Sequence, residues 1–185
     1  MSVPKRLSDQ LAEIGVAPGD VSRLAMSHLH FDHAGNANDY ASATWLVQRP
    51  ELEVAFDSTA APEYGFFTSL YDALESSQKV VLEGDHDVFG DGRVVIKFTP
   101  GHTMGHQALF VDLAEYGPVV LSGDLWHFTA QREARRVPNF NYDAEMTRAS
   151  MDSIESLIGE TGATLWIGHD AEQNAAIPHS PDFID

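Results

Sequence analysis

Histidine and aspartate side chains gather in one short stretch of the sequence, Ser27-His28-Leu29-His30-Phe31-Asp32-His33. Four side chains that can bind a metal fall within six residues there, directly after an apolar run that ends at Met26. Imidazole and carboxylate groups together suit zinc, with iron, manganese or cobalt as alternative ions. A polar loop that is rich in histidine by chance is the other explanation, but chance rarely gives this spacing. The stretch therefore predicts a metal site.

Three later segments also place a histidine or an aspartate beside glycine at the end of an apolar run. They are residues 99–106, 122–124 and 168–170. Glycine lets the backbone approach a bound ion closely, and a sheet can bring the ends of distant strands together. In the first stretch we expect extended backbone, so that His28, His30 and Asp32 project the same way and a turn brings His33 beside them.

These segments need strands and helices to position them, and the hydrophobic pattern predicts which. Strands are expected at residues 21–26, 44–47, 79–82, 87–89, 93–98, 107–112, 118–121 and 163–167, and the first of them is expected to be buried. Helices are expected at residues 8–14, 50–56 and 143–158, with Asp143 as the N-cap of the last. Because no repeat or linker interrupts the pattern, residues 1–185 are interpreted as a single layered α/β domain.

Composition narrows the classes of function. The chain has 185 residues, of which 43% are hydrophobic, enough for a sizeable core. It has no cysteine, which excludes disulfides, thiolate catalysis and cysteine-bound zinc. With 11 Lys and Arg residues and a net charge of −17, we expect no nucleic-acid partner. The apolar runs are too short to cross a bilayer, and the first residues lack the apolar core of a secretory signal, so we expect no membrane partner and a cytoplasmic protein.

The four segments resemble the metallo-β-lactamase superfamily, whose members share His-x-His-x-Asp-His followed by His, Asp and His at later strand ends. The resemblance implies an α/β fold of four αββα layers and two bound divalent metal ions, zinc or alternatively Fe, Mn or Co. It also implies a distribution of ligands between the ions: the first metal is held by His28, His30 and His102, the second by Asp32, His33 and His169, and Asp124 bridges them.

Within the superfamily, the segments that begin at Ser27, Thr99 and Leu121 are most similar to the N-acyl homoserine lactonase group. This resemblance implies an enzyme that hydrolyses a small-molecule lactone or related ester with a hydroxide held between the metals. Asp32 or Asp124 would orient the hydroxide and pass a proton to the leaving group. Several lactonases place a tyrosine three residues after the bridging aspartate; here the position is His127, which either donates a similar hydrogen bond or only lines the pocket. A glyoxalase-II-like thioesterase is the rival interpretation.

The segment before the first motif is short for this superfamily. Only 27 residues precede His28, whereas members usually place many tens of residues there, in strands of the first sheet. We therefore expect an N-terminally shortened fold and a homodimer or higher oligomer in which neighbouring chains cover the exposed sheet. A catalytically weak metal-binding remnant that needs a partner chain is the alternative from a different class.

Overall fold

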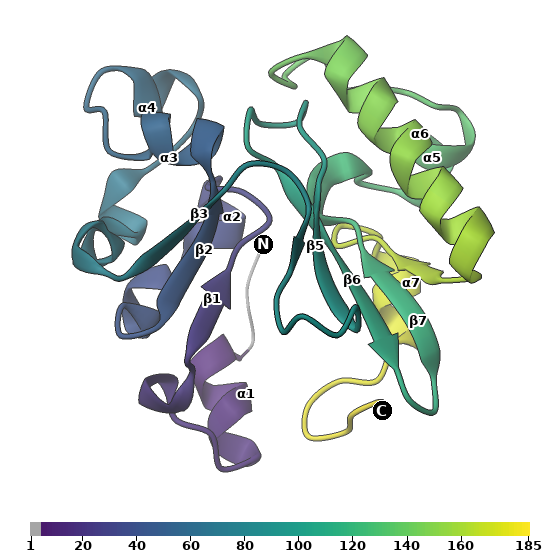
Figure 1. The fold of residues 1–185 in the computed structure, drawn as a ribbon, viewed down its shortest axis with the longest axis horizontal. Coiled ribbons are helices and arrows are strands. Elements are labelled where there is room, and N and C mark those ends of the chain that lie inside the picture. Colours follow the sequence, from purple (N-terminus) through teal and green to yellow (C-terminus); the bar gives the residue numbers. More distant parts are fainter. Residues whose placement is uncertain (1–4) are drawn as a thin grey trace.

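The structure, a computed structural model, describes residues 5–185. The first four residues of the predicted domain lie outside the described residues. The described residues form two sheets (Figure 1). The first sheet is parallel, in the order β1 (Arg23–Ala25), β2 (Thr44–Gln48), β3 (Lys79–Leu82). The second is mixed, in the order β4 (His86–Asp87), β5 (Val94–Phe98), β6 (Gln107–Leu113), β7 (Gly117–Leu121), β8 (Thr164–Trp166).

Helices and short 3-10 turns connect these strands. The α-helices are α1 (Leu7–Glu13), α2 (Phe31–Ala34), α3 (Arg49–Ala55), α4 (Ala60–Glu63), α5 (Thr129–Glu133), α6 (Ala144–Thr161) and α7 (Ala171–Ala176). The 3-10 turns are η1 (Pro18–Asp20), η2 (Ala37–Tyr40), η3 (Thr68–Leu70), η4 (Asp72–Ser76) and η5 (Gly123–Leu125). Along the described chain, no helix is both long enough and apolar enough to cross a membrane.

Helix α6 shows how a local sequence signal sets a boundary. The Asp143 carboxylate accepts hydrogen bonds from the backbone N–H groups of Glu145 and Met146, both at 2.8 Å, which confirms the predicted N-cap. The helix ends at Thr161 and is capped by Gly162, whose φ of 70° is a left-handed conformation that glycine adopts without strain.

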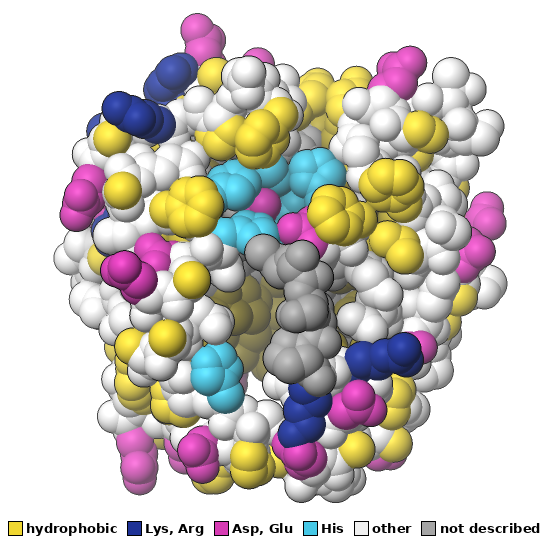
Figure 2. Space-filling view, turned by 180° about the vertical axis from the view of Figure 1, so that it is seen from behind, with side chains coloured by type: hydrophobic (Ala, Val, Ile, Leu, Met, Phe, Trp, Pro, Cys, Tyr) yellow, Lys and Arg dark blue, Asp and Glu magenta, His cyan; other side chains and the backbone are white. Residues whose placement is uncertain are grey.

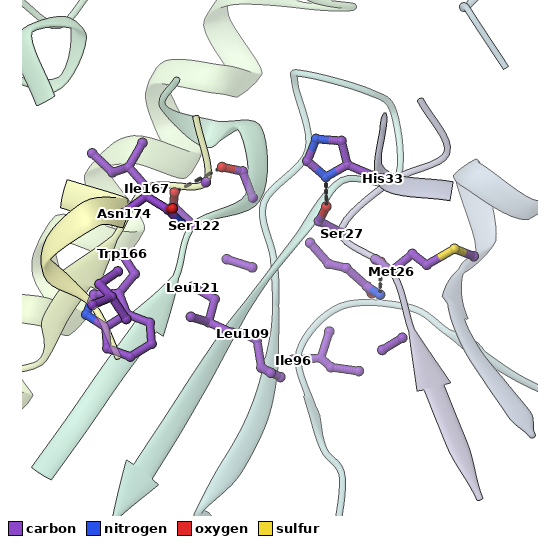
Figure 3. Close-up of a pocket in the computed structure, with 16 residues that line it drawn as sticks. Met26, Ser27, His33, Ile96, Leu109, Leu121, Ser122, Trp166, Ile167 and Asn174 are labelled. Carbon is purple, nitrogen blue, oxygen red and sulfur yellow. Dashed lines mark hydrogen bonds between the residues drawn. The ribbon is translucent and has the colours of Figure 1, made fainter. Parts of the chain in front are cut away.

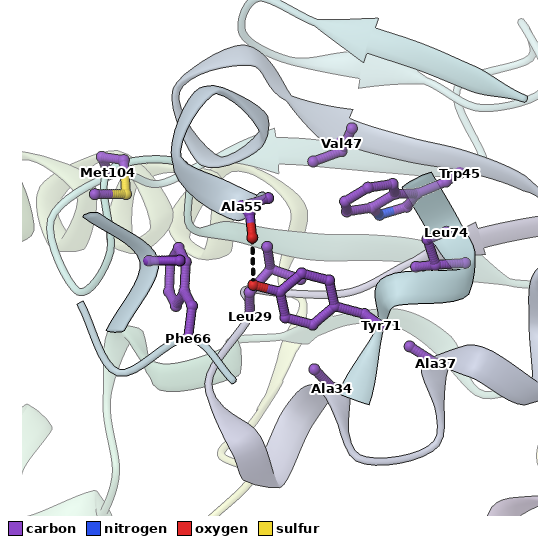
Figure 4. Packing of buried hydrophobic residues seen from close by; sticks show 11 residues of the cluster. Leu29, Ala34, Ala37, Trp45, Val47, Ala55, Phe66, Tyr71, Leu74 and Met104 are labelled. Atoms are coloured by element: carbon purple, nitrogen blue, oxygen red, sulfur yellow. Dashed lines mark hydrogen bonds between the residues drawn. The ribbon is translucent and has the colours of Figure 1, made fainter. Parts of the chain in front are cut away.

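The outer face of the first sheet packs against helices and turns that lie between its strands in the chain (Figure 4). Trp45 and Val47 of β2 point into this cluster, where they meet Ala55 of α3 and Leu74 of η4. The Tyr71 hydroxyl donates to the Ala55 carbonyl at 2.7 Å, so the polar end of this buried ring is paired. This cluster forms the first helical layer.

Alternate side chains of the central strands fill the space between the two sheets. Leu46 of β2 and Leu82 of β3 form one buried cluster with Ile96 of β5. On the other face of the second sheet, Val120 of β7 packs with Met151 of α6. Because side chains along a strand alternate in direction, each sheet has one face toward its helices and one toward the other sheet. The predicted four-layer αββα architecture is confirmed.

The buried strand predicted at residues 21–26 is wrong in one respect. The strand forms, but Arg23 and Ala25 are exposed and Leu24 is only half-buried. The reason is that β1 is an edge strand which pairs only with β2. Ala25 and the following Met26 border a cavity between the sheets, while Leu24 packs against the cluster under the first sheet.

Candidate metal centre

The first motif does not continue as extended backbone, contrary to expectation. His30 is extended, with φ of −63° and ψ of 155°, but α2 begins at the next residue. The backbone N–H groups of His33 and Ala34 both bond the His30 carbonyl, and the Ala34 side chain is fully buried. Burial of the apolar side of α2 therefore bends the chain, and Asp32 and His33 project from a helical turn.

Three histidines form the first trio, defined as His28, His30 and His102. The first two follow β1 and the third follows β5, so the trio draws on both sheets. His28 Nε2 lies 2.9 Å from His30 Nδ1 and 3.2 Å from His102 Nε2. His30 Nδ1 and His102 Nε2 are 3.0 Å apart. The structure thus brings together the residues that the resemblance assigns to the first metal, with nitrogens close enough to share one ion.

The protonation of two trio members favours a cation between them. His30 Nε2 donates to the Tyr64 carbonyl and His102 Nδ1 donates to Asn141 Oδ1, each at 3.1 Å. In a neutral imidazole the other nitrogen then carries a lone pair, so two lone pairs face each other across 3.0 Å. Burial lowers the pKa of both rings, that of His102 to about 4, which disfavours a proton between them. A metal ion fits this donor set.

The second trio is Asp32, His33 and His169, the residues that the resemblance assigns to the second metal. His169 Nε2 lies 3.4 Å from His33 Nε2 and 3.5 Å from Asp32 Oδ2. The side chains are only partly buried, in contrast to His28 and His102. His169 follows β8 at the edge of the second sheet, so this trio also takes members from both sheets.

Asp124, which follows β7, lies between the two trios. Its Oδ2 is 3.4 Å from His102 Nε2 and 3.9 Å from His28 Nε2. Its Oδ1 is 3.1 Å from His33 Nε2 and 3.3 Å from His169 Nε2. One carboxylate oxygen therefore faces each trio, which is the arrangement a bridging ligand requires.

The electrostatics of Asp124 follow from its neighbours. Burial acts to raise the pKa of its carboxyl, but hydrogen bonds from His127 and His33 and nearby imidazoles together hold that pKa well below its ordinary value. Burial likewise acts to lower the pKa of His33, and the Asp124 carboxylate outweighs it, so the pKa of His33 is raised. The centre is built around a fixed negative charge.

His106 supports Asp124 without joining either trio. It is fully buried, its Nδ1 donates to the Thr99 carbonyl at 3.0 Å, and its Nε2 accepts the Asp124 backbone N–H at 3.0 Å. Gly123 lies so close that a Cβ there would sit 2.7 Å from His106 Nε2. His106 is therefore a supporting histidine, which orients the bridging aspartate through hydrogen bonds.

A cavity of about 260 Å³ opens beside the first trio. Its walls include Tyr64, Phe140 and Tyr142, and Figure 2 shows hydrophobic side chains flanking the group of histidines on this face. Tyr142 lies far from the motifs in sequence, so the sequence alone did not assign it to the site. The structure brings it here because its backbone N–H donates to the His102 carbonyl at 3.0 Å. This cavity is the candidate substrate site.

His127 lies at the same centre. Its Nε2 is 3.2 Å from Asp124 Oδ2, and its ring stacks on that of His169 with centroids 5.4 Å apart. Its Nδ1 is buried, without a hydrogen-bond partner among the described residues. The side chain therefore reaches the reacting region, as its sequence position suggested.

A larger cavity of about 390 Å³ lies between the sheets, behind the centre (Figure 3). Leu109, Leu121 and Trp166 line it, and it reaches the centre where Ser27 contacts His33. His33 is the one trio member among the residues that line this cavity, whereas His30 and His102 line the smaller one, so the smaller cavity remains the candidate substrate site.

Fold and site together define a protein with an αββα fold and a two-metal centre of histidine and aspartate. The model of the metallo-beta-lactamase superfamily matches residues 2–169, and the chain belongs to that superfamily. N-acyl homoserine lactonase AttM of Rhizobium radiobacter is 32% identical over 182 residues, which cover 95% of this chain and 68% of that protein. N-acyl homoserine lactonase AiiA of Bacillus thuringiensis subsp. kurstaki is 29% identical over 184 residues, covering 100% and 70%.

Solved structures agree with this assignment. One is of an N-acyl homoserine lactone hydrolase with the product N-hexanoyl-L-homoserine bound at its catalytic metal center. It superposes with a TM-score of 0.83 at 29% identity, over 97% of this chain and 68% of that chain. The fold of this chain is therefore the metallo-β-lactamase fold, and a dinuclear metal site is typical of its family.

Proposed function

We propose that this chain is a metal-dependent hydrolase that opens lactones, with N-acyl homoserine lactones as the substrate class and zinc in both metal positions. The observation that carries the proposal is the placement of Asp124, with one oxygen toward each trio. The relatives named as N-acyl homoserine lactonases support the substrate class. Imidazole-rich sites with carboxylates suit zinc.

The reaction adds water to the lactone carbonyl and breaks the ring C–O bond, and the leaving alkoxide takes up a proton. Two divalent ions, if bound by the trios, would supply Lewis acidity and would lower the pKa of a bound water. Asp32 is suited to move the proton, because it lies at the centre and its side chain is 32% exposed. Asp124 is suited to hold the two positions at a fixed separation.

The remaining groups orient the substrate. We assign His127 as the hydrogen-bond donor to the lactone carbonyl, since its side chain lies at the centre, is 14% exposed, and has an Nδ1 without a hydrogen-bond partner among the described residues. The aromatic walls of the smaller cavity, Tyr64, Phe140 and Tyr142, offer apolar contact to the acyl part of the substrate.

A substrate panel tests this function. Zinc-loaded protein is offered an acyl homoserine lactone, a thioester, an aryl ester and a β-lactam, and product formation is followed for each. We expect the lactone to be opened and Asp124→Ala to lose that turnover, while the exposed Asp112→Ala keeps it. Unchanged lactone turnover in Asp124→Ala would sink the proposal.

The same panel separates the alternatives. Preferred turnover of the thioester would favour the glyoxalase-II-like interpretation, which shares the ligand set. Two bound metal ions with no turnover of any substrate would favour a metal-binding remnant that needs a partner chain.

We also propose that the chain associates with itself, as a homodimer or higher oligomer. Support comes from the edge strand β1 and from Leu121, which is 38% exposed on the wall of the larger cavity. Apolar surface of this kind favours association. Light scattering coupled to size-exclusion chromatography decides, because a monomer across a wide concentration range would contradict the proposal.

A further inference from the structure

Glu51 is a buried carboxylate that none of the reaction steps uses. It lies in the first turn of α3, outside both trios, and is 2% exposed. Buried carboxylates are rare unless they are hydrogen-bonded. Burial raises its pKa to about 7, against the opposing effect of three hydrogen-bond donors.

The three donors come from the two segments that carry the first trio. Glu51 Oε1 accepts the backbone N–H of Leu29 at 3.0 Å, and Leu29 separates His28 from His30 in sequence. Glu51 Oε2 accepts the Thr103 hydroxyl at 2.8 Å and the Gly105 N–H at 2.9 Å. Thr103 directly follows His102. One side chain therefore ties a segment after β1 to a segment after β5.

The approach of these segments to α3 is unusually close. A Cβ on Gly105 would lie 2.4 Å from the Glu51 Cβ and 2.6 Å from its backbone nitrogen, so only glycine fits there. The loop that carries His102 consequently rests directly on the helix. In the second trio, neither α2 nor the residues after β8 hydrogen-bond to Glu51 among the described contacts.

We propose that Glu51 is a positioning residue for the first metal ion alone: it holds the His28–His30 segment and the His102 loop at the separation that lets one ion contact all three rings. The inference rests on the proposed metal centre. Mutation of a residue that orients metal ligands typically lowers metal affinity about 10–100-fold. Here that loss is confined to one of two ions.

Stepwise zinc affinities measure the effect directly. Metal-free protein is titrated with zinc against a chromophoric chelator, and NMR of cadmium-loaded protein identifies which site is filled. Wild-type protein binds two equivalents. For Glu51→Ala we expect the first-trio affinity to fall about 10–100-fold while the second-trio affinity stays within about threefold of wild type.

Gln48→Ala is the matched control. Gln48 is also buried, lies three residues before Glu51, and hydrogen-bonds Gly84 and Gln107 instead of the loops of the first trio. We expect this variant to keep both zinc affinities. Equal weakening of both ions by Glu51→Ala and by Gln48→Ala would mean that Glu51 acts only through general stability, which overturns the inference.

Two milder variants keep the inference testable if Glu51→Ala does not fold. Glu51→Gln preserves volume but turns an NH₂ group toward backbone or hydroxyl donors, and Thr103→Val removes one of those donors. Both should weaken the first-trio ion selectively. Wild-type first-trio affinity in both variants overturns the inference, whereas wild-type protein that binds no metal would instead refute the proposed centre.

Discussion

Ser27 and His33 are joined by a contact of 3.1 Å between the serine Oγ and the imidazole Nδ1 (Figure 3). The same Oγ lies 3.1 Å from His28 Nδ1. One hydroxyl therefore contacts the Nδ1 of a member of each trio and turns both Nε2 atoms inward. This contact is not visible as a signal in the sequence, although Ser27 opens the motif.

Removal of this hydroxyl should affect both ions. For Ser27→Ala we expect both zinc affinities to fall, each about 10-fold, because both rings lose the partner that fixes their orientation. Chelator competition measures the affinities. Ser77→Ala is the control, since its hydroxyl bonds only the Ala41 carbonyl, far from the centre. Loss at one trio only would show that the hydroxyl serves one ring.

The metal-free protein should lose stability as the pH falls from 7 to 5. Burial lowers the pKa of His102 to about 4 and of His106 to about 3 from an ordinary 6.5, so the unfolded chain binds protons first. The contribution of these two neutral rings to the free energy of unfolding is complete above pH 6.5. It is lost as the pH falls below 6.5, by about 2 kcal/mol for each group by pH 5. His33, whose pKa is raised, contributes with the opposite sign.

Urea unfolding in the presence of a chelator checks this dependence. His179→Gln should leave the pH profile unchanged, because His179 is exposed near the end of the chain. A free energy of unfolding that is flat between pH 7 and pH 5 would contradict the burial of neutral imidazoles.

Chelation should destabilise the zinc-loaded protein. Each trio joins loops from both sheets, so a bound ion cross-links them and stabilises only the folded state. With free zinc at a hundredfold excess over Kd, each site contributes about 2.7 kcal/mol, or a shift in Tm of roughly 5–10 °C. Calorimetry with zinc and with a chelator gives the difference, and equal Tm values would show that the ions do not bridge the sheets.

Variants at His127 test its assignment as a donor. His127→Phe removes the N–H groups and should lower lactone kcat/KM about 10–100-fold, whereas His127→Tyr restores a donor and should stay within about fivefold of wild type. Zinc content, measured in parallel, should be unchanged in both. If His127→Phe retains full activity, the side chain only lines the pocket.

The parts of the structure that local sequence signals encode were predicted. Asp143 caps α6 as expected, and every proposed ligand after His33 follows a strand end. Strand positions were predicted to within a few residues because apolar runs bounded by glycine and aspartate specify them locally.

The features that the sequence did not predict depend on contacts between distant segments. Helix α2 replaces the expected extended backbone because Ala34 packs into the cluster around Trp45, which no local pattern reports. Asn141 reaches His102 across 39 positions, and Glu51 reaches Gly105 across 54. Such partners become visible only when the two sheets are placed against each other.

The distribution of ligands along the chain has a consequence for fragments. His28, His30, Asp32 and His33 precede the exposed turn at Gly90, while His102, Asp124 and His169 follow it. A chain cut at this turn would give two pieces, neither of which contains a complete trio. Association of the two fragments would then depend on the zinc concentration, because each ion needs ligands from both fragments.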